Sequence, residues 1–372
     1  MTMNRLRRVT VTGFKSIREM DLELGDLTVL IGANGAGKSN FVSLLRMLSF
    51  AMTGALQQWI GESGGADSIL HYGSKTTPQM TLDLEYETDK GTNRYHARLF
   101  DAAPDTLVFA DETVAFTPGK AGREGAPESL GSGHRESAVP DAGRSGNRRA
   151  AAALGCMRAW QVYQFHDTSA SATIRKQHYK HDNRYLRSDG GNLAAFLYGL
   201  RETKPQYYER IVKTIRLAAP FFDDFDLEPL VLSPEDVMLN WREVGRDYLL
   251  RPHHISDGAL RFMTLTTLLL QPEETLPELI VIDEPELGLH PYAISLLGSM
   301  VRSLRGVAQV ILATQSVPLL DEFEPGDVVV VDRHGGESLF AHLEPAELTD
   351  WLDEYSLSEL WEKNVIGGRP GR

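Results

Sequence analysis

The chain has 372 residues, a net charge of −13 and an apolar fraction of 42%, values of an ordinary soluble globular protein of about two to three domain-sized units. The acidic excess argues against a protein that coats nucleic acid through bulk positive charge. No stretch has the roughly 18 uninterrupted apolar residues of a membrane span, and the single cysteine excludes an internal disulfide. We therefore expect a cytoplasmic protein with no membrane partner.

The first 116 residues are dominated by strand patterns. Period-two alternation and short apolar runs predict strands at 9–11, 20–24, 27–31, 80–86, 95–100, 107–109 and 114–116. A helix is expected from residue 38 to about residue 52, directly after a glycine-rich loop. Such a pattern predicts an antiparallel sheet attached to a nucleotide-binding core.

Residues 117–150 are rich in Gly, Ser, Pro and Arg and predict a flexible insert. A DNA-touching arm stays open beside the simpler interpretation of a solvated loop, because the insert carries several arginines: Arg123, Arg135, Arg144, Arg148 and Arg149.

Regular patterns return after residue 150. Residues 151–250 predict an insertion with a strand at 160–165, helices at 193–200 and 207–217, and strand-like alternation at 227–250. Residues 251–333 predict helices at 257–270 and 291–304 and strands at 279–282, 310–313 and 328–331. Residues 334–372 predict an acidic tail with short helices at 346–352 and 356–361.

The stretch 27–40 reads LTVLIGANGAGKSN and fits G-x-x-x-x-G-K-[ST] between a strand and a helix. Glycines allow a tight turn whose N–H groups point at a polyphosphate, and the helix adds its positive N-terminal end. Lys38 is expected to reach the β- and γ-phosphates of ATP, and the Ser39 hydroxyl to ligate Mg²⁺. The candidate nucleotide-binding residues of the loop are Gly32, Asn34, Gly35, Ala36, Gly37, Lys38, Ser39 and Asn40.

A second acidic motif follows the apolar run at 279–282. Acids at the carboxyl end of a buried parallel strand lie where open α/β sheets bind ligands. We expect Asp283 to hold Mg²⁺ and Glu284 to orient and deprotonate an attacking water. An apolar run followed by two acids is a weak signal alone, and the phosphate loop makes it strong.

The order of these motifs resembles the ABC-type ATPases of the SMC and RecF kind, and most closely the stand-alone ATPases related to the overcoming-lysogenization-defect (OLD) family. The matching segments are residues 13–17 (GFKSI), 32–40, 256–261 (SDGALR), 282–291 (IDEPELGLHP) and 313–316 (ATQS). This resemblance implies an α/β fold, a P-loop NTPase head with a mixed sheet, flanking helices and an antiparallel β subdomain. Residues 1–116 and 251–333 would form one discontinuous ATPase domain, interrupted by a largely helical insertion.

The resemblance also implies a homodimer with ATP between the subunits. Ser256, Asp257 and Gly258 would then meet the γ-phosphate held by the partner's loop, at the start of the helix that follows. Either Gln161 or Gln164 would sense Mg²⁺ and water, and the pattern does not decide between them. Lys15 and Ser16, which follow Gly13 and Phe14, are further candidates for contact with the nucleotide. For Lys15, an ordinary solvated lysine in a turn is an equally good interpretation.

Two departures from the family pattern matter. Gln315 stands where many ABC ATPases have a switch histidine, and glutamine cannot carry a proton at neutral pH, so slow hydrolysis is expected. Residues 334–372 carry Glu344, Glu347, Asp350, Asp353 and Glu354 without strands to gather them, so we expect no Toprim nuclease site there. The histidines at 166 and at 253–254 are expected to be ordinary loop residues rather than zinc ligands.

Three functions remain in competition. The leading hypothesis is an ATP-gated dimeric switch in DNA repair or anti-phage defence, with a nuclease or other effector as partner and DNA as a second candidate partner. Its internal support is the basic and aromatic stretch 175–187, since arginines and lysines bind phosphates while tyrosines stack on bases. The alternatives are a non-catalytic ATP-dependent regulatory module and, less favoured, the nucleotide-binding subunit of a transporter.

Overall fold

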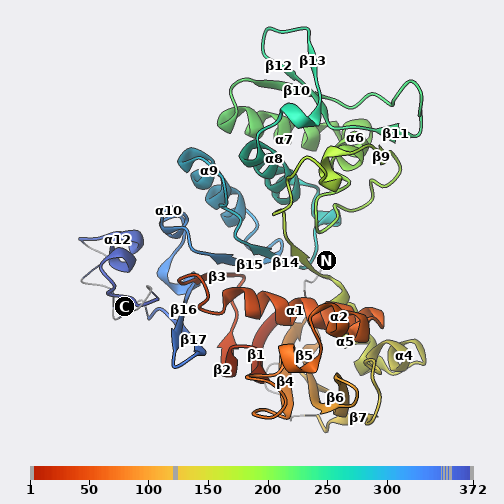
Figure 1. Cartoon of the computed structure of the whole chain (residues 1–372), viewed down its shortest axis with the longest axis vertical. Coiled ribbons are helices and arrows are strands. Elements are labelled where there is room, and N and C mark those ends of the chain that lie inside the picture. Colours follow the sequence, from red (N-terminus) through yellow and green to blue (C-terminus); the bar gives the residue numbers. More distant parts are fainter. Residues whose placement is uncertain are drawn as a thin grey trace.

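The computed structural model describes residues 4–119, 125–344, 346, 348, 351 and 354–368. Two large sheets lie face to face at one end of the molecule, and a helical layer followed by a small β subdomain extends from the second sheet (Figure 1). None of the helices in these residues combines the length and apolar character that a bilayer span requires.

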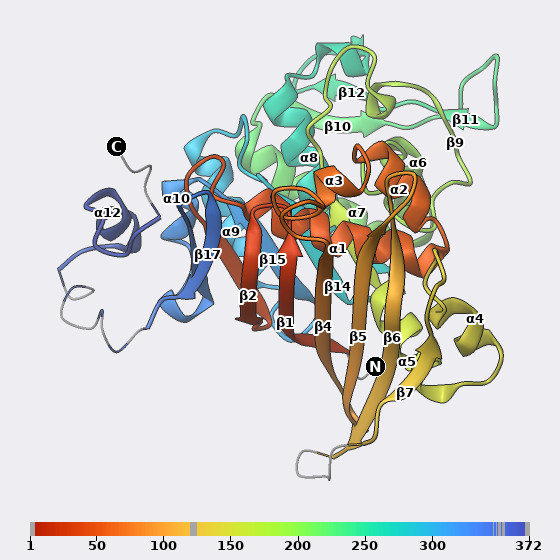
Figure 2. The same ribbon diagram turned by 60° about the horizontal axis from the view of Figure 1, so that its bottom comes forward.

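The first sheet is antiparallel and six-stranded, with the order β2-β1-β4-β5-β6-β7, and we call it the antiparallel sheet (Figure 2). Its strands are β1 (Arg5–Phe14), β2 (Ile17–Glu23), β4 (Gln79–Thr88), β5 (Gly91–Ala102), β6 (Thr106–Pro118) and β7 (Glu128–Gly131). Buried and exposed residues alternate along its central strands because only one face meets the core. The two strands expected at 107–109 and 114–116 are one continuous strand, β6.

The second sheet, which we call the core sheet, has the order β17-β16-β3-β15-β14-β8. Its strands are β3 (Leu27–Ile31), β8 (Trp160–Tyr163), β14 (Leu279–Asp283), β15 (Gln309–Thr314), β16 (Val328–His334) and β17 (Glu337–His342). All neighbours pair in parallel except β16 and β17. Every residue of β3, β14 and β15 is buried, as in a parallel sheet covered on both faces.

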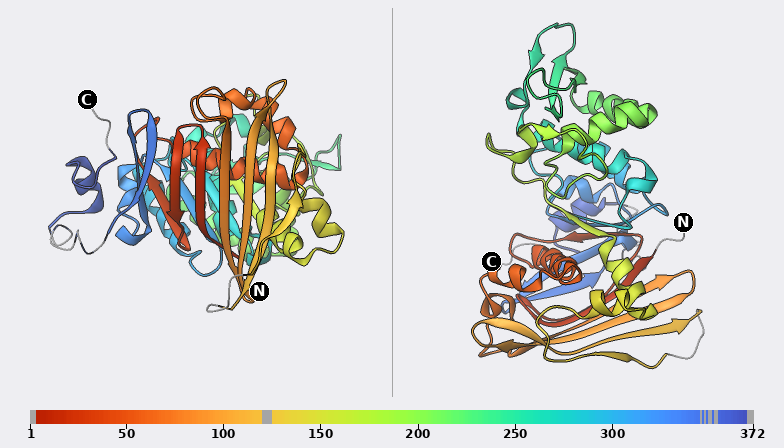
Figure 3. Two further views of the ribbon diagram at one scale, coloured as in Figure 1. Left: turned by 90° about the horizontal axis from the view of Figure 1, so that it is seen from below. Right: turned by 90° about the vertical axis from the view of Figure 1, so that its right-hand side faces the viewer.

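Helices cover both faces of the core sheet. The helices are α1 (Lys38–Thr53), α2 (Leu56–Glu62), α3 (Ala66–Ile69), α4 (Val139–Arg144), α5 (Arg148–Arg158), α6 (Leu193–Thr203), α7 (Pro205–Ala218), α8 (Asp257–Leu270), α9 (Pro291–Arg302), α10 (Val317–Leu320) and α12 (Leu357–Glu362). Helix α1 lies between the two sheets, where Phe41 and Leu45 are fully buried (Figure 3). Helices α6 to α9 contribute to a second core on the opposite face.

Neighbouring residues of the same strand pack into different cores, one on each face of the core sheet. Val281 and Ile311 belong to the core around α1, whereas Ile280 and Leu312 belong to the core around α8 and α9. This follows because successive side chains of a strand point to opposite faces. The core sheet therefore separates α1 from α8, which matters for the site below.

The predicted insertion is not separate from this sheet. Strand β8 pairs in parallel with β14 and forms one edge of the core sheet among the described residues. Beyond β8 lie the short strands β9 (His178–Tyr179), β10 (Phe222–Asp226), β11 (Asp236–Val237), β12 (Asn240–Glu243) and β13 (Leu249–Leu250). They pair as β9 with β11 and as β10-β12-β13, at the end of the molecule away from the antiparallel sheet (Figure 1).

The expectation of a flexible insert at 117–150 is wrong for most of its described residues. These residues form the end of β6, β7, α4 and the start of α5. Asn147 caps α5 by accepting from the N–H groups of Arg149 and Ala150. Small residues carry the packing, since Ala150 and Ala153 are fully buried, so the lack of large apolar residues was misleading. Arg123 lies outside the described residues.

The C-terminal tail was expected to carry short helices and no strands, and the second part of this expectation is wrong because β17 extends the core sheet. A turn at Gly335 and Gly336, both with positive φ, folds β17 back against β16. Helix α12 follows at 357–362, near the expected 356–361. Most of the expected helix 346–352 lies outside the described residues, as do Glu347, Asp350 and Asp353.

Candidate nucleotide site

The loop between β3 and α1 is closed in by backbone from the far end of the core sheet. A Cβ on Gly32 would lie 2.1 Å from the Val331 carbonyl oxygen. Gly37 has a φ of 121°, and a Cβ there would lie 2.0 Å from the Ser338 hydroxyl. Only glycine fits either position without displacing a neighbour. The tip of the loop, Asn34 and Gly35, is exposed.

Lys38 is folded into this loop. Its amine donates hydrogen bonds to the carbonyl oxygens of Gly32, at 2.6 Å, and Ala33, at 3.0 Å. Burial lowers the pKa of Lys38, and the charges of Glu284 and Asp283 oppose that effect. The amine is therefore a buried donor in a loop whose tip, Asn34 and Gly35, is exposed, an arrangement suited to a phosphate.

Ser39 and Asp283 meet across the carboxyl edge of the core sheet. The Ser39 hydroxyl donates to Asp283 Oδ1 over 3.4 Å. Burial raises the pKa of Asp283, and the hydrogen bond from Ser39 opposes that shift. A hydroxyl and a carboxylate oxygen are hard ligands of the kind Mg²⁺ uses when substrate phosphates and water complete its shell. No group of three His, Cys, Asp or Glu side chains that could hold a metal ion occurs among the described residues.

Glu284 is held in an uncommon backbone conformation beside Asp283. Its φ is 45°, and its N–H donates to the Ala313 carbonyl over 2.7 Å. Gln315 Nε2 donates to Glu284 Oε1 over 3.4 Å. Left-handed backbone in a residue other than glycine costs about 1–2 kcal/mol and is concentrated at functional sites. Thus the two expected catalytic side chains are brought together.

A third carboxylate supports this pair. Glu286 Oε1 accepts the Gln315 backbone N–H at 3.1 Å. Burial raises the pKa of Glu286. Glu286 therefore holds the backbone of Gln315 in place. The sequence motif alone did not indicate this role.

The two glutamine candidates separate clearly. The pairing of Tyr163 with Ile282 brings Gln164 level with Asp283, and Gln164 Oε1 accepts from Arg46 of α1 at 2.9 Å. Gln161 pairs with Ile280, about 10 Å back along the strand at ~3.3 Å per residue. Gln161 lines a cavity at the β8 edge of the core sheet and shares a second, smaller pocket with Gln164. The geometry therefore favours Gln164 at the nucleotide site.

His166 also reaches this edge of the sheet. Its Nε2 lies 3.1 Å from the Asp283 carbonyl oxygen. The contact joins the loop after β8 to the strand that carries the acids, so His166 is a positioning group for the backbone of Asp283.

The turn before the loop contacts the first turn of α1. Asn40 Nδ2 donates to the Ser16 hydroxyl at 2.6 Å, and the hydroxyls of Ser16 and Ser338 are also 2.6 Å apart. Ser338 Oγ in turn donates to the Ala36 carbonyl at 2.6 Å. Lys15 donates to Ser43 at 2.7 Å, and burial lowers its pKa. Lys15 also lines a pocket together with Ser16 and Asn40. Ser16 therefore touches the loop directly, whereas the amine of Lys15 lies against α1.

Ser256, Asp257 and Gly258 lie at the start of α8, across the core sheet from α1 (Figure 1). Ser256 caps the helix by accepting the Ala259 N–H at 3.3 Å, and the side chains of Ser256 and Asp257 are exposed. A Cβ on Gly258 would lie 2.1 Å from the Gly288 carbonyl oxygen. These residues do not join the loop of their own chain into one site.

Arg175 positions this segment. Its guanidinium donates to the Thr168, Pro252 and Ile255 carbonyls and to Asp257 Oδ1, the last at 2.7 Å. The stretch 175–187 had been a candidate nucleic-acid contact, and this buried side chain does not serve as one. The sequence pattern alone did not indicate that Arg175 connects two loops.

Arg261 makes a comparable link from the first turns of α8. It donates to the carbonyls of Phe165 and His166 and to the Leu287 carbonyl, at 2.8–2.9 Å. The loop after β8, the start of α8 and the segment after Glu284 are thereby tied together. Its place in the SDGALR segment was the available sequence signal.

The residues missed by sequence reasoning come from distant segments. Ser338 and Arg333 lie on the hairpin of β16 and β17, and Arg333 donates to the Gly35 carbonyl at 3.1 Å. A basic residue before a Gly-Gly turn is a weak signal, and it gives no indication of contact with a loop some 300 residues earlier.

A phosphate loop at the carboxyl edge of a parallel sheet, facing Asp283 and Glu284, is the arrangement of a P-loop ATPase fold. The family model described as "AAA domain, putative AbiEii toxin, Type IV TA system" matches residues 27–141 and 164–322, and the chain belongs to this family. No curated protein matches the chain significantly.

Solved structures show the same fold. The chain is similar to the SmcHead bound to the C-winged helix domain of ScpA, with a TM-score of 0.64 and 14% identity over 92% of this chain and 99% of that one. It is also similar to the Smc head domain with an extended coiled coil bound to the C-terminal domain of ScpA derived from Pyrococcus furiosus, with a TM-score of 0.59 and 14% identity over 95% and 99%. The expected fold class is confirmed.

Proposed function

We propose that this protein binds ATP with Mg²⁺ at the loop of residues 32–40 and hydrolyses it. The observation that carries the proposal is the contact of Ser39 with Asp283, with Glu284 next to it. Asn40, the last residue of the loop, lines a pocket of about 530 Å³ together with Ser16 and Tyr72, among others. This volume lies in the range of small-molecule sites, about 300–1,000 Å³, and suits the nucleoside end of ATP.

The geometry supports the following proposed roles. Loop N–H groups and the Lys38 amine bind the β- and γ-phosphates. Ser39 and Asp283 would hold Mg²⁺, which would neutralise charge at the transferred phosphoryl group. Glu284 accepts the proton of the attacking water, and the amide of Gln315 orients that water. Gln164 lies level with Asp283 and is placed to report the bound nucleotide to the loop that follows β8.

We further propose that a second copy of the chain completes the site. The start of α8 presents an exposed hydroxyl and a helix N-terminus, an anion-binding end that no loop residue of the same chain occupies among the described residues. The same surface patch on two copies would meet in a C₂ dimer with two equivalent ATP sites. Ser256 and Gly258 would then contact the partner's γ-phosphate.

For the biological role we propose an ATP-gated switch in anti-phage defence or DNA repair that acts through a nuclease or other effector. The family description, which names a toxin of a toxin–antitoxin system, supports defence more than repair. Direct DNA binding by the stretch 175–187 has less support than its composition indicated. Arg175 is buried, Lys180 pairs with Glu235 at 3.3 Å, and Arg187 pairs with Asp182 at 2.7 Å.

The testing experiment compares wild type with Glu284→Gln. The variant should lose at least about 100-fold in ATP turnover, as expected when a general base is removed. It should also form an ATP-dependent dimer measurable by light scattering, and Ser256→Arg should abolish that dimer while each chain still binds ATP. Unchanged turnover in Glu284→Gln would remove Glu284 as the base. A wild type without turnover that still dimerises with ATP would instead establish the non-catalytic regulatory module.

A further inference from the structure

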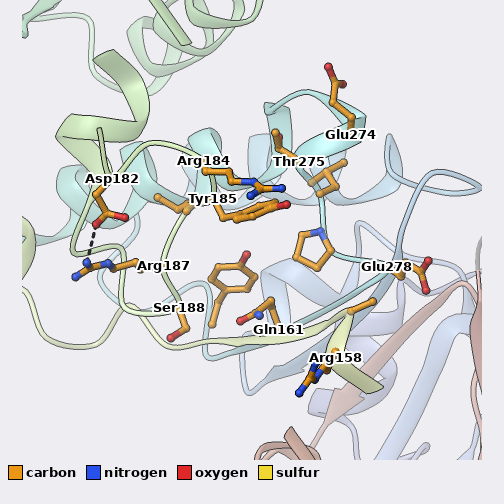
Figure 4. Close-up of a pocket in the computed structure, with 15 residues that line it drawn as sticks. Arg158, Gln161, Asp182, Arg184, Tyr185, Arg187, Ser188, Glu274, Thr275 and Glu278 are labelled. Carbon is orange, nitrogen blue, oxygen red and sulfur yellow. Dashed lines mark ion pairs between the residues drawn. The ribbon is translucent and has the colours of Figure 1, made fainter. Parts of the chain in front are cut away.

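A cavity of about 560 Å³ opens at the β8 edge of the core sheet (Figure 4). None of the phosphate-loop residues lines it. Its walls come from β8, from the segment 182–188 and from the segment 274–278. The volume lies within the range of about 300–1,000 Å³ that is usual for small-molecule sites.

A tyrosine hydroxyl without a protein partner among the described residues faces this cavity. Tyr163 is 2% exposed, and its hydroxyl makes no hydrogen bond within the described part of the chain. Tyr163 nevertheless lines the cavity, so its oxygen is reachable from there. Burial raises the pKa of Tyr163, which keeps the hydroxyl protonated and able to donate at neutral pH. Because no protein acceptor takes this hydrogen bond among the described residues, the hydroxyl is free to donate to a ligand in the cavity.

An aromatic platform lies on the opposite wall. The Tyr185 side chain is 54% exposed, and the Arg184 guanidinium lies 5.2 Å from its ring centroid. Figure 4 shows Arg184 on one side of this ring and the amide of Gln161 on the other. One ring face is thus occupied by a cation, and the other faces the cavity. A planar ring bound there would stack on Tyr185.

Internal ion pairs cancel several charges around the cavity. Arg187 pairs with Asp182 at 2.7 Å, a contact drawn in Figure 4. Glu274 pairs with Lys204. These four side chains therefore add little net charge to the site.

The remaining charges favour an anion. The other charged side chains that line the cavity are two cations, Arg158 and Arg184, and one carboxylate, Glu278. Burial raises the pKa of Glu278, and Asn4 donates to its Oε2 at 2.9 Å. Arg158 uses Nε and Nη2 on the Met52 carbonyl and keeps Nη1 available among the described residues. The ligand chemistry is therefore a planar, hydrogen-bonding ring with a negative substituent.

We propose that this cavity is a second ligand site, for a nucleobase that carries a phosphate. The base stacks on Tyr185, its edge accepts from the Tyr163 hydroxyl and pairs with the Gln161 amide, and the phosphate meets Arg158. The source is either a free nucleotide or an exposed base of single-stranded nucleic acid. Both present the same chemistry to these side chains.

The site is connected to the nucleotide edge of the sheet. Ser188 lines the cavity, and its carbonyl accepts the Gln164 N–H at 3.0 Å. Gln161, Tyr163 and Gln164 lie within four residues on β8 and its extension. A ligand in the cavity would therefore change the position of Gln164. Any effect of that change on ATP hydrolysis rests on the proposed ATPase function, whereas ligand binding itself does not.

Binding is measured in a Lys38→Ala background, which weakens the phosphate loop. Isothermal titration uses AMP, GMP and UMP, and fluorescence anisotropy uses a labelled ten-nucleotide single strand. Tyr163→Phe removes only the hydroxyl and should weaken binding about 3- to 10-fold. Tyr185→Ala should weaken it about 5- to 100-fold. The control is Tyr179→Ala, since Tyr179 is also 54% exposed and lies outside the cavity, and it should leave the affinity unchanged.

The outcomes separate the sources. Saturable monophosphate binding that depends on Tyr163 and Tyr185 supports a free nucleotide, and binding confined to the oligonucleotide with the same dependence supports single-stranded nucleic acid. No saturable binding of either probe, or binding that both variants leave unchanged, overturns the proposal. ATP turnover of the Tyr163→Phe single variant is recorded separately, so a failure here is distinguishable from a failure of the ATPase proposal.

Discussion

The guanidinium of Arg175 lies 2.7 Å from the carboxylate of Asp257, although Arg175 is only 5% exposed and Asp257 is largely solvent-accessible. The contact joins the loop after β8 to the segment that starts α8. Two parts of the proposed composite site, one facing its own nucleotide and one facing the partner's, are thereby linked within a single chain.

Replacement of Arg175 by Met should disconnect these two loops. Three backbone carbonyls would lose their donor, at about 1–3 kcal/mol for each that stays buried and unsatisfied, so the free energy of unfolding should fall by at least about 2 kcal/mol. Turnover should fall at least about tenfold while ATP affinity stays unchanged, because the phosphate loop is not touched. Urea unfolding, steady-state kinetics and nucleotide titration measure the three quantities.

The matched control is Arg210→Met, since Arg210 lies exposed on α7. It should change neither stability nor turnover measurably. A loss of ATP affinity in Arg175→Met equal to its loss of turnover would contradict a role confined to the start of α8.

Gly258→Ala should disrupt the packing of α8 against the segment after Glu284. The added Cβ would lie 2.1 Å from the Gly288 carbonyl oxygen, so backbone must move. We expect turnover to fall at least about tenfold with a loss of stability of about 1–3 kcal/mol, as for other overpacked sites. Steady-state ATPase assays and thermal unfolding test this.

Gly61→Ala serves as the comparison for that variant. Gly61 lies in α2 with no atom within 4 Å of an added Cβ. Because Gly in a helix is less favourable than Ala by about 0.5–1 kcal/mol, this change should be neutral or stabilising. A Gly258→Ala protein as active and stable as Gly61→Ala would refute the steric argument.

Glu112 anchors the described part of the former insert to the antiparallel sheet. Its carboxylate is fully buried and accepts from the Tyr95 and Ser137 hydroxyls, the Ala138 N–H and a ring nitrogen of His134, at 2.6–3.0 Å. Glu112→Gln places an amide donor against these donors and should cost about 1–3 kcal/mol. ATP affinity should be unchanged, because no nucleotide-site residue contacts Glu112.

Urea unfolding checks the Glu112 prediction beside Glu62→Gln. Glu62 is exposed on α2 and accepts one bond, from Gln58 at 2.8 Å. That control should lie within about 0.5 kcal/mol of wild type, as surface changes usually do. Equal midpoints for the two variants would show that the network does not stabilise the fold.

His96 gives the antiparallel sheet a pH dependence. Its ring nitrogens lie 2.9 Å from Asp83 and 3.0 Å from Asp111 on the flanking strands, and the hydrogen bond with Asp83, opposed by burial, raises the pKa of His96 above 6.5. The folded state thus binds the proton more tightly. Its stabilisation is complete below pH 6.5 and is lost as pH rises through the folded-state pKa.

The measurement is the melting temperature at pH 6.0 and pH 8.0 for wild type and His96→Gln. Wild type should lose more stability between these values than the variant. An equal loss in both would show that other groups cause the dependence.

Contiguous motifs were predictable because their chemistry depends on local spacing. The glycines and Lys38 of the loop need only one strand and one helix around them, and the acids at 283 and 284 need only the end of an apolar strand. These segments, and the fold class that they imply, could be predicted from the order of residues alone.

The tertiary structure decided everything that depends on register between strands or on contacts between distant segments. Gln164 rather than Gln161 lies at the nucleotide edge because β8 pairs with β14 in one register, and a shift by one residue would invert the faces. Ser338 and Arg175 entered the account only through contacts with segments 302 and 82 residues away. Such contacts leave no local sequence pattern, because serine and arginine occur just as commonly on solvent-exposed surfaces.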